Sequence, residues 1–301
     1  MALPLRAPKN TPMVPKGIIK NADCRRELPK IEARSISLIL TDPPYFIDGM
    51  DGEWNHARLR QRCKKSVIGG LPVGMKFSTA QGRNLYHFLL PLAEEWLRII
   101  KPGGFVLCFS QARLMHRTAT AIEDAGFEIR DMLAWRYEGQ AKAFSQDHFI
   151  RRRNLSESVK KKMIRDLEGR KTPQLKPQME LIVLAQAPRE GTFADNWLRY
   201  RAGLINPSNP LVEPSRFPGT VIPVPKPRDR YGHMTAKPVN LLRHLIRIFC
   251  AEDRHAIVCD PFAGSGSTGV AACVEGRDFV GFEIDKAMAK TAAHRIAKAV
   301  L

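Results

Sequence analysis

Two short segments, far apart in the chain, hold the residue types best suited to chemistry. The first is Thr-Asp-Pro-Pro-Tyr at positions 41–45, directly after the apolar run 37–41. Asp42 can accept a hydrogen bond from an amino group, and the carbonyl of Pro43 can accept a second. Because consecutive prolines lack backbone N–H groups and have restricted dihedrals, Pro44 helps to hold that carbonyl rigid. Two such acceptors would aim the lone pair of a nucleobase amino group at an electrophilic methyl group.

Tyr45 completes this segment and offers a flat face on which an unstacked base could lie. So short a motif also suits a proline-bounded turn with a surface acid and a core tyrosine. The apolar run before it places Asp42 at the carboxyl end of a strand, where open α/β sheets bind ligands. This position favours the chemical interpretation.

The second segment, Ile257 to Gly269, reads as a strand, a glycine-rich turn and the start of a helix. Gly264 and Gly266 allow close approach to a ligand, and the following helix start offers free N–H groups. Glu283 ends the next strand, where an acid can bind both hydroxyls of a ribose. Together with Asp260 it would repel a diphosphate, and no phosphate-binding Gly-Lys-Ser/Thr follows the glycines. We expect a nucleoside site, with a plain glycine turn as the alternative.

Positive charge is concentrated in two stretches of the 301-residue chain, which carries 48 basic and 30 acidic residues. Residues 54–84 hold seven Lys or Arg and no acid, and residues 142–176 hold eleven basic and four acidic residues. Phosphates neutralised by Lys or Arg release counterions, so a polyanion is the economical partner. Solvated loops without a ligand are the alternative.

Strand and helix patterns alternate along residues 17–301, which predicts one α/β domain preceded by a flexible basic arm at 1–16. We expect a doubly wound, mostly parallel, seven-stranded sheet with helices on both faces. The predicted strands are 17–21, 37–41, 104–109, 127–136, 180–185, 256–259 and 279–282. The predicted helices are 85–100, 111–125, 239–251 and a last helix over 285–300, capped by Asp285.

Three segments interrupt this pattern: a basic loop at 54–84, a basic insertion at 138–178 and a proline-rich region at 187–231. The six cysteines form no Cys-x-x-Cys pair, which argues against a zinc knuckle and a disulfide framework. No apolar run is long enough for a secretory signal or a membrane span. We therefore expect a cytoplasmic protein without a metal or a membrane partner.

Three motifs in order, TDPPY, HMTAKPVNLL and DPFAGSGSTG, resemble those of the S-adenosylmethionine-dependent DNA amino-methyltransferases. The resemblance is to the permuted group, in which the catalytic tetrapeptide precedes the cofactor loop, and covers 17–137, 178–185 and 231 to the end. Ala22 and Met234 replace the usual glycine and proline of two motifs but leave the functional side chains in place. The resemblance implies a circularly permuted Rossmann-like sheet, S-adenosyl-L-methionine as cofactor and double-stranded DNA as partner.

The resemblance also implies roles for individual residues. The target base would be bound by the tetrapeptide Asp42, Pro43, Pro44 and Tyr45. The cofactor would be bound near its adenine by Asp23 and Cys24, at its ribose by Glu283, at its carboxylate by Thr235 and Lys237, and elsewhere by Asp260, Phe262, Gly264, Ser265, Gly266 and Ser267.

Target recognition would fall in the region 187–231, while the basic loop 54–84 could close over DNA. Trp54 would then be a wedge between bases or, equally, a buried anchor. The candidate DNA-binding residues are Trp54, Arg58, Arg60, Lys64, Lys65, Arg151, Arg152 and Arg153.

An aspartate opening the tetrapeptide goes mostly with adenine N6 in this family, and a serine mostly with cytosine N4. We therefore expect site-specific methylation of the N6 amino group of a flipped-out adenine in duplex DNA. Alternatives are cytosine N4, an RNA or protein substrate, and a non-catalytic DNA-binding protein with a vestigial pocket. Intact Asp42, Tyr45 and Glu283 argue against the last. Whether the protein acts as a homodimer stays open.

Overall fold

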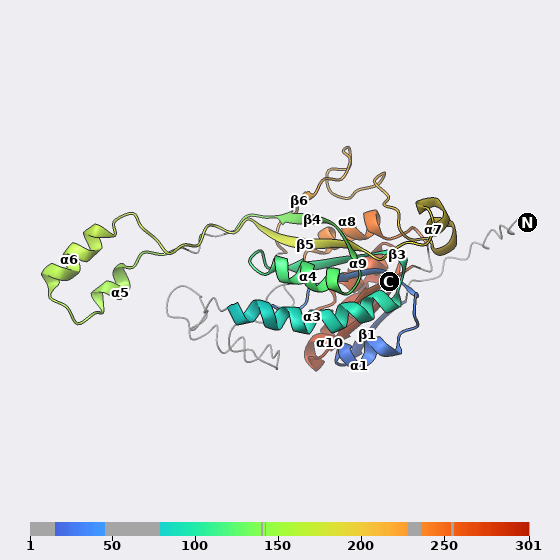
Figure 1. Cartoon of the computed structure of the whole chain (residues 1–301), viewed down its shortest axis with the longest axis horizontal. Coiled ribbons are helices and arrows are strands. Elements are labelled where there is room, and N and C mark those ends of the chain that lie inside the picture. The colour runs from blue at the N-terminus through green and yellow to red at the C-terminus, as the bar shows by residue number, and fades with distance from the viewer. Residues whose placement is uncertain are drawn as a thin grey trace, which may run out of the picture.

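A computed structural model describes residues 16–45, 79–139, 141, 143–227, 236–253 and 256–300. Its described part forms one sheet in the order β1-β8-β7-β2-β3-β5-β4-β6 (Figure 1). Neighbouring strands run parallel except where β5 pairs antiparallel with β3 and β4. The strands are β1 Gly17–Asn21, β2 Ile36–Thr41, β3 Ile100–Ser110, β4 Glu128–Arg136, β5 Met179–Gln186, β6 Val221–Pro223, β7 Ile257–Asp260 and β8 Asp278–Glu283.

All seven predicted strands are present, but the expected strand number was wrong because the described sheet has eight. The additional strand, β6, lies in the proline-rich region 187–231 and pairs with β4 at the edge of the sheet. A strand of three residues that ends in Pro223 gives no alternating pattern to detect. Its edge position is the one where a residue without a backbone donor is tolerated.

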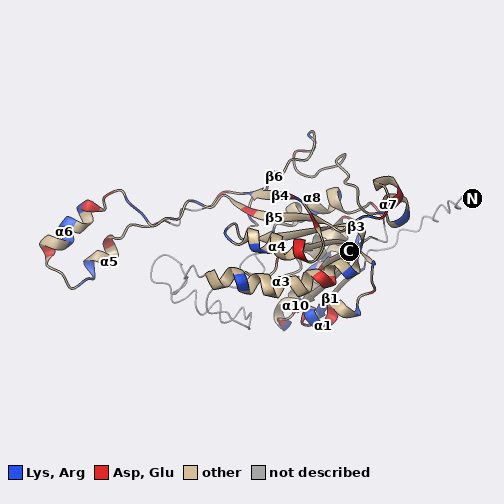
Figure 2. Ribbon diagram, viewed as in Figure 1, with Lys and Arg blue, Asp and Glu red and all other residues tan. Residues whose placement is uncertain are grey.

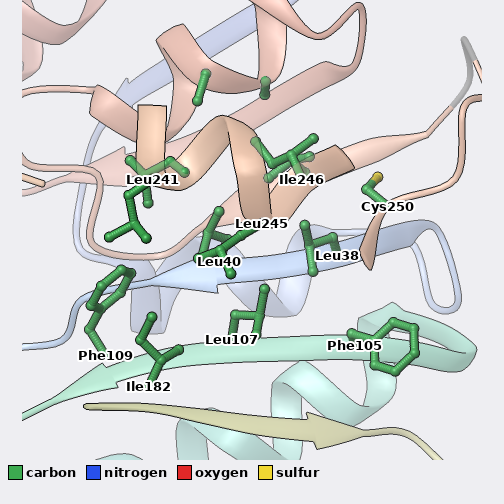
Figure 3. Close-up of a cluster of buried hydrophobic side chains, with 14 of the residues drawn as sticks. Leu38, Leu40, Phe105, Leu107, Phe109, Ile182, Leu241, Leu245, Ile246 and Cys250 are labelled. Carbon is green, nitrogen blue, oxygen red and sulfur yellow. The ribbon is translucent and has the colours of Figure 1, made fainter. Parts of the chain in front are cut away.

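Helices cover both faces of the central strands, so every residue of β2 is buried. On one face, Leu38 and Leu40 of β2 pack in the same cluster as Leu241 and Leu245 (Figure 3). On the other face, Ile39 belongs to a second cluster with residues of α3 and α4. The helices are α1 Cys24–Glu27, the 3-10 helix η1 Leu28–Lys30, α3 Thr79–Ile99, α4 Met115–Asp124, α5 Asp147–Arg151, α6 Glu157–Asp166, α7 Phe193–Tyr200, α8 Val239–Phe249, α9 Ser267–Val274 and α10 Lys286–Val300.

The helix boundaries confirm the last predicted helix and correct one loop. Asp285 caps α10, since its Oδ1 accepts hydrogen bonds from the backbone N–H groups of Ala287 and Met288 at 2.8 and 3.0 Å. Helix α3 starts at Thr79, so the predicted loop 54–84 is helical over its last six residues. Within the described ranges, no helix is long and apolar enough to cross a membrane.

The basic insertion 138–178 projects away from the sheet between β4 and β5 and carries α5 and α6 near its tip (Figure 1). None of the residues of α6 is buried. Lys and Arg side chains recur along this projection (Figure 2). We call residues 138–178 the basic arm; its helices contribute little to the packed core.

Buried side-chain amides join the start of the region 187–231 to the first residues of β3. Asn196 on α7 donates to the carbonyls of Pro102 and Ala202, both at 2.9 Å, and accepts from the backbone of Glu190. The side chain of Gln186 donates to Gly103 at 2.9 Å. These bonds satisfy backbone groups that packing would otherwise leave without partners.

Candidate functional site

The two sequence segments meet at the carboxyl ends of adjacent parallel strands, as predicted. Strand β2 pairs with β7, and the Thr41 hydroxyl at the end of β2 donates to Oδ1 of Asp260 at 2.7 Å. Asp42 follows Thr41 directly. The tetrapeptide and the glycine loop therefore start side by side.

Asp42 is held by two donors, one on each carboxylate oxygen. The Tyr45 hydroxyl donates to Oδ1, and Lys237 Nζ, just before α8, donates to Oδ2 at 2.5 Å. Burial and the nearby Asp42 raise the pKa of Tyr45 well above its usual value, so it is a neutral donor. The side chain of Asp42 is 19% exposed and lies at the edge of the protein interior.

Lys237 contacts two acids at the tetrapeptide. Its ammonium lies between Asp42 and Glu180, with Nζ 3.0 Å from Oε2 of Glu180 on β5. Burial by itself would lower the pKa of Lys237, but the two carboxylates outweigh burial and the pKa is raised. Lys237 is therefore a buried cation at the tetrapeptide. Its predicted role towards the cofactor stays a prediction, and Thr235 lies outside the described residues.

The sequence analysis did not identify Glu180 as a site residue. It stands near the start of the strand MELIVLAQ, and the one available signal was an acid in an otherwise apolar run. Such an acid usually marks the solvated end of a strand. Only the position of β5 relative to α8 shows that this one faces a lysine.

The glycine loop has the conformation that its sequence predicts. Gly264 and Gly266 both have positive φ, of 52° and 80°. The backbone N–H of Gly264 donates to Oε2 of Glu283 at 2.9 Å, while that of Asp285 donates to Oε1 at 2.7 Å. Burial raises the pKa of Glu283. A Cβ at Gly266 would lie 2.8 Å from Cβ and 2.9 Å from Cα of Ala292, so α10 leaves no room for one.

The two serines of this loop contact α10. Arg295 donates from Nη1 to the Ser265 hydroxyl at 3.0 Å and to the Ser267 hydroxyl at 3.3 Å. Both serines are buried. The ring of Phe262 packs against Phe88 of α3, with centroids 5.9 Å apart. The loop is thus clamped from α10 and α3, and sequence reasoning had not identified Arg295.

The Asn-Ala-Asp-Cys turn lies beside the end of β8. The backbone N–H of Ala22 donates to the carbonyl of Glu283 at 3.1 Å. Asp23 caps α1 through the N–H of Arg25 at 3.0 Å and forms an ion pair with its guanidinium. Cys24 is buried. The structure therefore brings Asp23, Cys24 and Glu283 together, although their predicted roles at a cofactor are untested.

Asp260 connects the two segments from inside the protein. Its Oδ1 accepts from Thr41 and also from the backbone N–H of Phe262 at 3.0 Å. Burial raises the pKa of Asp260 to about 6. With only 3% of the residue exposed, it is placed to hold the strand ends together.

The candidate DNA-binding residues divide into two groups. Arg151, Arg152 and Arg153 are exposed on the basic arm, which projects away from the sheet (Figure 1). The others lie outside the described residues: Trp54, Arg58, Arg60, Lys64 and Lys65.

Fold, motif order and site define a class of nucleic-acid-modifying transferase. Residues 36–294 match the family model for the DNA methylases that act on N6 or N4 amino groups, and the chain belongs to this family. The family predicted from the three motifs is therefore confirmed.

The sequence similarity to individual relatives covers most of the chain. The type II methyltransferase M.HindIII of Haemophilus influenzae is 28% identical over 300 residues, covering 92% of this chain and 94% of that protein. The DNA adenine methyltransferase YhdJ of Escherichia coli is 26% identical over 286 residues, covering 92% and 82%.

Solved structures confirm the fold. The cytosine-N4-specific PvuII DNA methyltransferase superposes with a TM-score of 0.58 at 16% identity, covering 95% of this chain and 91% of that one. The M1.HpyAVI–SAM complex superposes with a TM-score of 0.52 at 17% identity, covering 92% and 98%.

Replacing Gly266 should test the fit of the loop against α10. We expect Gly266→Ala to lower the free energy of unfolding by at least about 2 kcal/mol, because an L-residue at positive φ is strained and Ala292 blocks its Cβ. Urea denaturation gives the value. Gly219→Ala is the control, since Gly219 has open space around it and should change stability by less than about 0.5 kcal/mol. Equal effects of the two variants would contradict the predicted constraint.

The raised pKa of Asp260 predicts a pH-dependent stability with a definite sign. The unfolded chain releases this proton near pH 3.8, whereas the folded protein keeps it to about pH 6. The free energy of unfolding should therefore fall as pH rises between these values, by about 3 kcal/mol from this group.

Asp260→Asn should remove this fall, because Asn keeps the Oδ1 acceptor for Thr41 and Phe262 but cannot ionise. Urea denaturation of both proteins from pH 4 to pH 7 measures the difference. Parallel pH curves would show that Asp260 does not titrate in this range.

Proposed function

We propose that this DNA methylase transfers a methyl group from S-adenosylmethionine to the N6 amino group of a flipped-out adenine in duplex DNA. The observation that carries the proposal is the position of Asp42. Its carboxylate lies at the end of β2, next to the glycine loop, and the backbone of that loop is hydrogen-bonded to Glu283 at the end of β8. We place the reaction in the cytoplasm, with the DNA. A homodimer is compatible with this chemistry and is not required by it.

The residues of the glycine loop fit a nucleoside cofactor without a phosphate. Gly264 and Gly266 give the loop its positive-φ backbone, and the carboxylate of Glu283 suits ribose hydroxyls. The carboxylate of Asp260 is a second acid at this site, and it would repel a negatively charged diphosphate. S-adenosylmethionine, when bound, supplies an electrophilic methyl group on a sulfonium. The SAM complex of the similarly folded M1.HpyAVI supports this assignment.

Asp42 would orient the target amino group. A carboxylate has about four acceptor sites, so the hydrogen bonds from Tyr45 and Lys237 leave capacity for an N–H of the base. The carbonyl of Pro43 would accept the second N–H. The nitrogen lone pair then forms the N–C bond to the methyl group as the S–C bond breaks, with the electron pair staying on sulfur. The nitrogen, now cationic, loses one proton to a base or water.

Adenine is favoured over cytosine by two observations. The tetrapeptide opens with an aspartate, and the relative YhdJ is named as a DNA adenine methyltransferase. Cytosine N4 is the second candidate, because the PvuII enzyme shares the fold and is named as specific for that atom.

The reaction is tested with labelled S-adenosylmethionine and mixed-sequence duplex DNA, followed by nucleoside digestion and mass analysis. We expect N6-methyladenine from the wild-type protein. Asp42→Ala should lower the rate by at least about a thousandfold, since an acceptor of the transition state is removed, while cofactor binding persists. Asp131→Ala, at an exposed position on β4, is the control. N4-methylcytosine as product would overturn the choice of base, and full activity of Asp42→Ala would overturn its role.

The basic arm is proposed to bind DNA phosphates. Its three consecutive arginines, Arg151 to Arg153, are exposed, and α6 adds three consecutive lysines, Lys160 to Lys162. Because this arm projects from the sheet, it could contact duplex outside the segment that carries the target base (Figure 2).

Replacing Arg151, Arg152 and Arg153 together with alanine should weaken binding to all duplexes alike. The slope of log K against log salt should become shallower by about 1 for each phosphate that the arm no longer neutralises. Fluorescence anisotropy at several salt concentrations measures the slope. Arg130→Ala, a change at an exposed arginine on β4, is the control and should leave it unchanged. An unaltered slope in the triple variant would remove the arm from the DNA interface.

A further inference from the structure

Three charged side chains from separate parts of the chain meet at the tetrapeptide. Lys237 Nζ lies 2.5 Å from Oδ2 of Asp42 and 3.0 Å from Oε2 of Glu180. The lysine side chain is 7% exposed, and those of the two acids are 19% and 27% exposed. We call Asp42, Glu180 and Lys237 the charge triad.

The charge triad contains two acidic residues and one lysine, so its formal net charge is minus one. Asp42 alone would already neutralise Lys237. A second acid in partly buried surroundings adds a desolvation cost that the ion pair does not require. Glu180 therefore does more than neutralise the lysine, because it makes the net charge of the triad negative.

Three further ionisable groups near the triad are neutral. Tyr45 donates to Asp42, and burial raises the pKa of Cys108 on β3 and of Tyr137 after β4, so all three stay neutral. The ring of Phe109 lies 5.0 Å from Lys237 Nζ. Of the other described charged groups nearby, Asp260 is buried beyond Thr41, and Lys226 Nζ lies 3.8 Å from the centroid of the Tyr137 ring.

A net negative charge at this place matches the charge that the proposed reaction develops. The target nitrogen gains a bond to carbon while it still holds two hydrogens, so positive charge moves from the cofactor sulfur to that nitrogen. This charge appears beside Asp42, the group that would hold the amino group. A neutral Asp42–Lys237 pair would stabilise it less than a site with net charge minus one.

We propose that Glu180 is a positioning residue for methyl transfer, which holds Lys237 against Asp42 and gives the charge triad its net negative charge. The inference rests on the proposed function, since it concerns the same reaction. It assigns Glu180 a role that the three sequence motifs do not contain.

Glu180→Gln is the direct test, because glutamine keeps the length and an acceptor for Lys237 but removes the charge. We expect kcat to fall about tenfold, which corresponds to one net charge acting on the transition state. The KM values for cofactor and DNA should change by less than about twofold, since ground-state contacts are retained. Glu180→Asp, which restores the charge, should recover most of kcat. Glu128→Gln, an exposed change on β4, is the control.

The variant Glu180→Asp separates charge from architecture. It keeps the negative charge but shortens the side chain, so recovery of kcat relative to Glu180→Gln would show that the charge matters. If Glu180 only supported the structure through its packing, Glu180→Asp would be no faster than Glu180→Gln. Urea denaturation of each variant verifies that it is folded.

The rates are measured in single turnovers on an unmethylated duplex that contains a sequence methylated by the wild-type protein. A Glu180→Gln rate within about twofold of wild type, or a Glu180→Asp rate no faster than that of Glu180→Gln, would overturn the inference while wild-type methylation still supports the proposed function. Absence of any methylated base with the wild-type protein would instead contradict the proposed function, and this inference with it.

Discussion

The ammonium of Lys237 is the interaction on which the proposed site depends most. A buried cation costs several kcal/mol unless it is paired, and here Asp42 and Glu180 both provide compensation. The pairing joins the segment just before α8 to the end of β2 and the start of β5. Since Asp42 is the acceptor proposed for the target amino group, the same contacts that satisfy the lysine also orient the tetrapeptide.

The parallel pairing of β2 with β7 is the second constraint. It puts the tetrapeptide and the glycine loop at one edge of the sheet, although more than half of the chain separates them. The hydrogen bond from Thr41 to Asp260 joins the two strand ends, and Arg295 of α10 holds the loop from the other side. Sites of this kind form where the strand order of an open sheet reverses, because the connections diverge there and leave a crevice.

Outside the sheet, two irregular segments differ in how they are attached to the core. The basic arm carries charge away from the core on two short helices, and α6 buries nothing. By contrast, the hydrogen bonds of Asn196 and Gln186 attach the start of the region 187–231 to β3. The proline-rich part of the region follows this attachment point. The projecting arm is the segment proposed above to bind DNA phosphates, and the anchored region is the one in which target recognition was predicted.

Sequence by itself determined the seven principal strands, the cap at Asp285, the glycine conformations and the family, because each depends on a few neighbouring residues. Strand β6, the start of α3 and the contacts of Glu180 and Arg295 were not predictable in this way. Glu180 and Lys237 are far apart in the chain, and their contact exists only because β5 enters the sheet next to β3, antiparallel to it. Local patterns encode backbone conformation, but the order of strands, which decides which charges meet, is a property of the packed sheet as a whole.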